Sequence, residues 1–209
     1  MEEGEQKERH LEKADQKGVR YRCYQLLQNV RFNGEPVVPQ LLSEVKPHQL
    51  LGTAFEVEQL EGKDLAEFLH DPSISLQTKW KVLLYIIRQF QAIDEAGYVL
   101  FDRHGGNIRV LEWETKISVR QMDIEDMYDK NRNKVYSSDG NWDISLIRSL
   151  EKKGVDPWFY ACKAIANQGI GLAQRTGNER MAGVLKRLID QPGSSLSDFE
   201  KALRAAVEG

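Results

Sequence analysis

The strongest pattern of apolar and polar positions lies between residues 76 and 96. Apolar side chains recur there every three or four positions, as on one face of a helix. They are Leu76, Trp80, Leu83, Leu84, Ile87, Phe90 and Ile93. Ser75 is a residue type that caps helix N-termini, and Gly97 readily adopts the left-handed conformation that ends a helix. The spacing therefore predicts a helix over 76–96.

Weaker helical spacing appears on both sides of this segment. Before it, apolar residues predict a helix over 19–30 and a short helix over 64–69 that Pro72 stops. After it, the same spacing predicts four helices, over 142–152, 157–174, 178–190 and 197–207. Ser197 and Glu200 have the spacing of a capping box for the last of these.

Strand-like runs are shorter and gather in two places. Residues 37–45 and 50–60 predict a hairpin with its turn at Pro47, and residues 108–111 and 117–122 predict two strands after the long helix. Because strands and helices are segregated along the chain, the pattern favours an α+β fold over a doubly wound sheet.

Two segments are too polar for either pattern. Residues 2–17 alternate acidic and basic side chains, which is typical of a solvated helix or a tail. Residues 126–141 are rich in Asp, Asn, Ser and Gly, and we expect them to form a loop.

Composition and charge narrow the class of protein. The chain has 209 residues, of which 41% are apolar and 29% charged, so it is long enough and apolar enough for a real core. Its net charge of −3 provides no basic field for nucleic acid or anionic lipid, and we expect neither partner. The densest apolar run, 82–87, is far shorter than a membrane span. Cys23 and Cys162 have no metal-like spacing and fit a reducing compartment, so the expected location is the cytoplasm.

The candidate chemistry lies directly after the long helix. Asp102 is followed five residues later by Asn107, and Asp123 ends the second of the two strands that come next. Phosphoryl transfer needs a carboxylate that orients the acceptor hydroxyl and oxygen ligands that hold magnesium. Gly105 and Gly106 allow a tight backbone path between these groups.

This spacing resembles the catalytic loop of the protein kinase-like superfamily. There an Asp, four intervening residues and an Asn are followed by a metal-binding Asp in a hairpin, as Asp102, Asn107 and Asp123 are here. The sequence of the loop, with His104 two residues after the first Asp, is similar to the corresponding loops of phosphoinositide kinases and aminoglycoside phosphotransferases. The Asp-Ile-Glu sequence at 123–125 is similar to the corresponding motif of choline kinases. The resemblance covers residues 19–150.

The resemblance implies a kinase-like fold with a mostly helical C-terminal lobe and a truncated N-terminal lobe. Residues 1–18 would be a charged tail or helix, 19–60 the reduced small lobe of a helix plus a hairpin, and 61–209 the large lobe.

The resemblance also implies a site for ATP and magnesium. Asp102 would be the catalytic residue that orients the acceptor, and the magnesium ligands would be Asn107, Asp123 and Glu125. The nucleotide would be bound by a hinge segment and the loop, through Glu58, Leu60, Gly62 and His104.

Several features depart from the kinase pattern. No Gly-x-Gly-x-x-Gly loop occurs, no strand-borne lysine precedes the helix over 19–30, and no Ala-Pro-Glu follows residues 126–141. Three interpretations therefore stay open. The chain is an ATP- and magnesium-dependent phosphotransferase whose acceptor, a protein hydroxyl or a small molecule, is unknown. It is instead an inactive pseudokinase-type binding or scaffold module. Or it is a fragment whose first strands come from an upstream segment or a partner protein that completes the small lobe.

Overall fold

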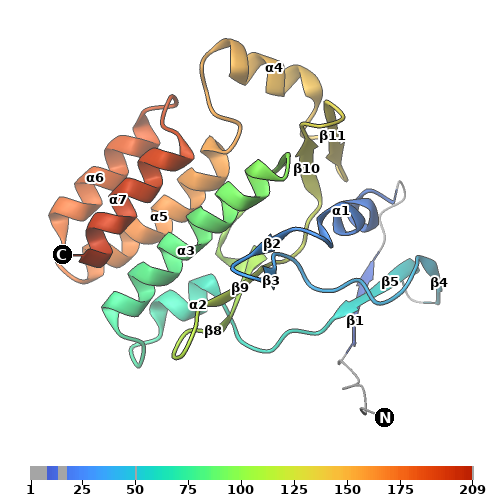
Figure 1. Cartoon of the computed structure of the whole chain (residues 1–209), viewed down its shortest axis with the longest axis horizontal. Helices are drawn as coiled ribbons and strands as arrows, with labels where there is room; N and C mark the ends of the chain where they lie inside the picture. The colour runs from blue at the N-terminus through green and yellow to red at the C-terminus, as the bar shows by residue number, and fades with distance from the viewer. Residues whose placement is uncertain (1–8, 14–17, 50, 209) are drawn as a thin grey trace.

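The computed structural model describes residues 9–13, 18–49 and 51–208 of the chain (Figure 1). Its helices are α1 (Val19–Leu27), α2 (Leu65–His70), α3 (Leu76–Glu95), α4 (Ile144–Lys152), α5 (Phe159–Arg175), α6 (Glu179–Asp190) and α7 (Leu196–Glu208), with a short 3₁₀ turn η1 (Gly105–Asn107). Every helix that the apolar spacing predicts is present, and none of its ends is shifted by more than three residues.

The strands of the described residues are short and form small antiparallel sheets. They are β1 (Arg9–Lys13), β2 (Arg31–Phe32), β3 (Glu35–Pro36), β4 (Lys46–His48), β5 (Gly52–Glu58), β6 (Lys63–Asp64), β7 (Tyr98–Leu100), β8 (Ile108–Glu112), β9 (Ser118–Gln121), β10 (Asp126–Asp129) and β11 (Lys134–Ser137). The sheets run β1-β5-β4, β11-β10-β7, β2-β3 and β6-β8-β9. The predicted α+β class is confirmed.

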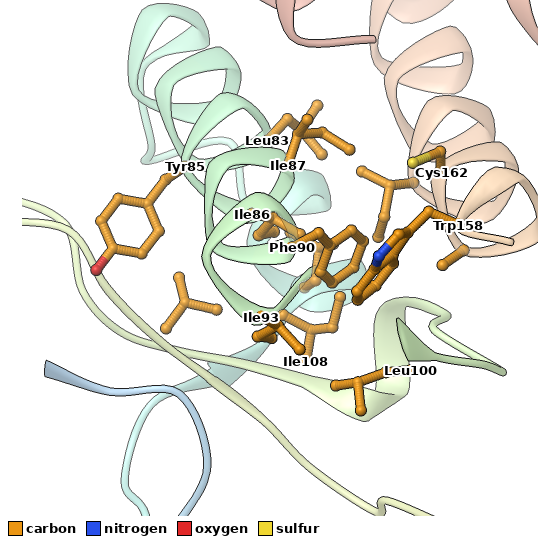
Figure 2. Packing of buried hydrophobic residues seen from close by; sticks show 14 of the residues in the cluster. Leu83, Tyr85, Ile86, Ile87, Phe90, Ile93, Leu100, Ile108, Trp158 and Cys162 are labelled. Atoms are coloured by element: carbon orange, nitrogen blue, oxygen red, sulfur yellow. The ribbon is translucent and has the colours of Figure 1, made fainter. Parts of the chain in front are cut away.

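Four helices, α3, α5, α6 and α7, form one layer on the side of the molecule away from β1, β4 and β5 (Figure 1). α3 lies at the side of this layer that faces the small strands (Figure 1), and it is buried along most of its length. Figure 2 shows Phe90 of α3 facing Trp158, and the two rings stack with centroids 4.7 Å apart. Ser75 caps α3 by accepting from the backbone N–H of Thr78, and Gly97 ends it with a left-handed φ of 90°, as predicted.

The last helix begins with a different capping box from the predicted one. The Ser195 hydroxyl accepts from the Asp198 backbone N–H, and the Asp198 carboxylate accepts from the Ser195 N–H at 2.9 Å. The prediction of Ser197 and Glu200 was wrong because Glu200 points to the neighbouring helix. Its carboxylate accepts from Arg88 and Gln91 of α3, each at 3.0 Å, and ties the two helices together.

The expectation of a solvated helix or tail was wrong for the five residues of β1, which form a strand. Arg9–Lys13 pairs antiparallel with β5 along its full length. Its sequence has no alternating apolar face, because the strand is held at the sheet edge by backbone hydrogen bonds and Leu11 is 39% exposed. The remainder of the predicted 1–18 segment, apart from Gly18, lies outside the described residues.

The predicted first hairpin is correct in its second strand and wrong in its first. β5 lies within 50–60, but its hairpin partner is β4, which contains Pro47, and residues 37–45 form no regular strand. Within that segment the Gln28 side chain supplies hydrogen bonds that a ladder would otherwise give. Its amide donates to the Pro39 carbonyl at 2.9 Å and accepts from the Leu41 N–H at 2.8 Å.

The expected loop over 126–141 was also wrong for most of its length. β10 and β11 form a hairpin there, and β10 pairs with β7 on its other edge. The strands escaped notice because β10 begins and ends with aspartates that are both buried. Asp129 is partnered by Arg132, whose guanidinium lies 2.9 Å from its carboxylate. The strands expected over 108–111 and 117–122 are present as β8 and β9.

None of the helices in the described part of the chain is both long and apolar enough to cross a membrane.

Candidate functional site

The segment between β7 and β8 folds into a closed loop around η1. The Asn107 side-chain amide donates to the carbonyl of Asp102 at 2.9 Å, and the Asn107 N–H donates to the His104 carbonyl at 3.0 Å. The ring of His104 accepts from the Gly106 N–H at 3.1 Å, so it caps the turn while its ring stays exposed. Asn107 is buried, whereas Asp102 is exposed. The structure thus joins the two predicted residues in one loop and leaves the Asp102 carboxylate open to solvent.

A buried arginine fastens this loop to the connection between β9 and β10. Arg103 is 1% exposed, and its guanidinium donates to the carbonyls of Phe101 at 2.8 Å, Met122 at 2.7 Å and Asp123 at 3.0 Å. The Met122 N–H in turn donates to the Asn107 carbonyl at 2.8 Å. Asp102 and Asp123, separated by twenty residues, are therefore held by one rigid set of hydrogen bonds.

Burial and nearby charges act on Arg103 in opposite directions. Removal from water lowers the pKa of its guanidinium, and the carboxylates of Asp102, Asp123 and Asp126 oppose that effect. Asp126 is itself buried, and burial raises the pKa of its carboxyl, with further contributions from the charges of Asp139 and Asp102. The region is thus an acidic cluster organised around one internal cation.

Both aspartates adopt a strained backbone conformation. The described non-glycine residues with positive φ are Asn33, Asp102, Asp123 and Asn133, at 52°, 49°, 48° and 50°. The two asparagines lie in hairpin turns, where that residue type is common. The two aspartates lie in no hairpin turn. Strain of this kind costs of order 1–3 kcal/mol and gathers at functional sites.

A second cation joins Asp123 to Glu125. The guanidinium of Arg20, in the first turn of α1, lies 3.0 Å from the Asp123 carboxylate and also contacts the Glu125 carboxylate. The other oxygen of Glu125 accepts from the Ser138 hydroxyl at 2.8 Å. The two predicted metal ligands therefore converge on a single positive charge.

This convergence bears on the expected magnesium ion. Within the described ranges no group of three or more His, Cys, Asp or Glu side chains is placed to hold a metal. Magnesium, however, is commonly held by one or two carboxylates, with substrate phosphates and water completing its shell. Two carboxylates that already share one cation fit that requirement.

The predicted hinge residues are occupied by contacts within the protein. A side chain at Gly62 would come within 2.2 Å of the Val110 carbonyl, so this glycine is needed for the close approach to β8. Its own carbonyl accepts from Arg109 at 3.1 Å. Glu58 ends β5 and exchanges hydrogen bonds with Gln40.

Leu60 is half-buried in the connection between β5 and β6. That connection leads into α2, where Ala66 lies 3.1 Å from the position of a side chain at Gly105. The hinge segment therefore reaches the Asp102 loop by way of α2, and the contacts above do not bring Glu58 or Gly62 to the carboxylates.

Strand β1 contradicts one of the departures from the kinase pattern that the sequence suggested. It ends in Lys13, opposite Ala54 of β5, and it precedes α1. The expectation that no strand-borne lysine precedes this helix was therefore wrong.

Sequence reasoning missed the side chains that assemble the site. Arg20, Arg103 and Ser138 come from three separate segments. Only Arg103 had a local signal, its position beside Asp102, and that signal does not indicate burial.

No protein family model matches the chain, and no curated protein matches it in sequence.

Proposed function

We propose that this protein is an ATP- and magnesium-dependent phosphotransferase of the protein kinase-like superfamily that acts on an alcohol group. The observation that carries the proposal is the set of hydrogen bonds from Arg103, which holds two aspartates with left-handed φ at one site. Strain and a buried charge are both unfavourable for folding, and their coincidence at the aspartates predicted from spacing favours a functional origin.

The exposed carboxylate of Asp102 orients the acceptor hydroxyl and accepts its proton. Asn107, Asp123 and Glu125 would hold magnesium, which when bound neutralises charge on the transferred phosphate. The closed loop keeps the Asn107 amide fixed through its bond to the Asp102 carbonyl. The acceptor belongs to either of two classes, a small molecule or a protein hydroxyl.

The arrangement of the small sheet supports a kinase-like fold with a truncated small lobe. β1 carries a lysine, pairs with β5 and precedes α1, and β5 leads into the segment proposed to bind adenine. In protein kinases a strand lysine contacts the nucleotide phosphates and pairs with a glutamate of the following helix.

One observation favours a second function, that of a scaffold without catalysis. Arg20 already neutralises Asp123 and Glu125, so this pair has a cation without any metal. A pseudokinase-type module would keep the loop as a stable protein-binding surface and bind no magnesium.

Calorimetric titration with ATP separates the two functions. We expect ATP to bind wild type more tightly with magnesium than without it, and Asp123→Asn to lose that difference. Glu114→Gln is the matched control, because Glu114 is exposed in the turn between β8 and β9. Absence of ATP binding to wild type, with and without magnesium, would reject the phosphotransferase and leave the scaffold.

A further inference from the structure

The ion pair between α1 and the candidate metal ligands carries an inference beyond the catalytic roles. Arg20 is the second residue of α1, and its side chain is 19% exposed. It contacts one oxygen each of Asp123 and Glu125, whose side chains are 47% and 34% exposed. A mostly buried cation thus lies against two carboxylates that water still reaches.

The oxygens that Arg20 contacts are the ones a metal ion would need. Ser138 already donates to the second oxygen of Glu125, which directs the first oxygen to the shared cation. A metal ion that bridged the Asp123 and Glu125 oxygens as the guanidinium does would lie in the position of the guanidinium, and the two positive charges would repel each other there. Binding of a metal between these two carboxylates therefore requires the Arg20 side chain to move away.

The start of α1 lacks the usual capping side chain. Its N-cap is Gly18, with φ of 64°, and glycine has no side chain that could cap the first turn. The first turn also has no acidic residue, so Asp123 and Glu125 supply the negative charge that favours a helix N-terminus. Loss of Arg20 from the pair thus loosens the contact of α1 with the β9–β10 connection.

We infer that Arg20 is an internal competitor for divalent metal at the Asp123–Glu125 pair, so that metal binds only when the first turn of α1 releases them. The inference rests on the proposed function, because it takes this pair as metal ligands. It adds a means of regulation to that function. The protein alternates between a state in which Arg20 contacts the two carboxylates and a state in which metal does, and a ligand that moves α1 sets the ratio of the two states.

The test measures Mn²⁺ binding in the absence of nucleotide, by the spectroscopic signal of the free ion. We expect Arg20→Gln to bind Mn²⁺ about tenfold more tightly than wild type, equivalent to about 1.4 kcal/mol. Arg22→Gln is the matched control, since Arg22 is exposed on the same helix and donates to Gln25. It should bind as wild type does. Adding Asp123→Asn to Arg20→Gln should remove the gain.

Two outcomes would overturn the inference and are distinguishable. If wild type and Arg20→Gln bind Mn²⁺ with equal affinity, Arg20 does not compete and the metal site of the proposed function stands. If neither protein binds Mn²⁺, the competition and the metal role of Asp123 and Glu125 both fail.

Thermal unfolding shows whether the Arg20→Gln variant is folded. Without metal, Arg20→Gln should melt below wild type, because two acidic groups lose their partner. Mn²⁺ should raise the melting temperature of Arg20→Gln by more than that of wild type, since at one ligand concentration the stabilisation is larger for the protein that binds more tightly. A larger rise in wild type contradicts the inference.

Discussion

Two neighbouring regions of the molecule treat polar groups in opposite ways. In the helical layer of α3, α5, α6 and α7, the polar side chains that make defined contacts largely lie at helix ends or between helices near the surface. Ser75, Asn178 and Ser195 each cap the helix that follows. In the loop cluster, formed by residues 101–107 and 122–126, Arg103, Asn107 and Asp126 are buried among backbone carbonyls and acids.

The difference is one of cost. The helical layer gains stability from buried apolar area, as in the stacked Phe90 and Trp158 (Figure 2), and its caps satisfy local backbone groups. In the loop cluster, a buried guanidinium has lost its hydration and two aspartates have a strained backbone, and both effects lower the stability of the fold. A fold keeps such an arrangement where the groups are used, which is why the comparison points to the loop cluster as the site.

The largest expected effect comes from removing the cation of the loop cluster. Arg103→Met removes the donor to one buried and two part-buried carbonyls, and we expect a loss of about 3–5 kcal/mol in the free energy of unfolding. Denaturant unfolding measures it, and magnesium-dependent ATP binding should disappear as well.

Phe90→Ala in the helical layer is the matched comparison. It should lose a similar 3–5 kcal/mol through a cavity, yet below its unfolding transition it should keep magnesium-dependent ATP binding. Equal loss of binding in both variants would show that the two regions do not differ as described.

An intermediate effect contrasts two ion pairs, one between β3 and β9, outside both regions, and one in the helical layer. Glu35 of β3 pairs with Arg120 of β9, whose side chain is 8% exposed, whereas Glu200 of α7 pairs with Arg88, whose side chain is 37% exposed. We expect Glu35→Gln to cost about 1–2 kcal/mol at pH 7 and Glu200→Gln less than about 1 kcal/mol.

The effect of Glu35 should depend on pH. Hydrogen bonds from Lys116 and then Arg120 hold the pKa of Glu35 below its ordinary value. A lowered carboxyl pKa gives stability that is complete above the unfolded pKa, about 4.5, and is lost as pH falls through the folded pKa. Denaturant midpoints of wild type and Glu35→Gln should therefore differ at pH 7, and the difference should shrink as pH falls below about 4.5. A constant difference across this range would rule out the ionised Glu35 as the cause.

How much the sequence predicts also differs between the regions. The helical layer follows from apolar spacing alone, because apolar residues recur in each of its helices at helical spacing, and the bounds of α3 match the prediction almost residue for residue. The cap of α7 was misplaced by two residues because Ser195 and Ser197 both allow a capping box and tertiary contact with α3 decides between them.

The loop cluster was predictable only in its local part. Gly105 and Gly106 predicted a tight backbone path between Asp102 and Asn107, and in the structure the Asn107 amide donates to the Asp102 carbonyl. The roles of Arg103 and Arg20 depend on contacts with residues 19 to 105 positions away, which no local pattern encodes. β1 and the β10–β11 hairpin were missed for a related reason, since backbone pairing with distant strands holds charged sequences there.

The smallest expected effect isolates the strain at one aspartate. Glycine adopts the left-handed φ of Asp102 without steric cost, whereas alanine pays about 1 kcal/mol or more. We expect Asp102→Gly to be at least as stable as wild type and Asp102→Ala to be less stable than Asp102→Gly by about 1 kcal/mol, as measured by denaturant unfolding. Asn133, with nearly the same φ in a hairpin turn, provides the comparison position, where the alanine and glycine variants should differ by a similar amount.

Neither Asp102 variant should transfer phosphate, although both Asn133 variants should still bind ATP with magnesium. If Asp102→Gly is as stable as wild type but does not transfer phosphate, the carboxylate at this position is retained for its chemistry. Equal stability of Asp102→Gly and Asp102→Ala would instead show that the backbone at this position stores no strain, and the main structural argument for a catalytic loop would be lost.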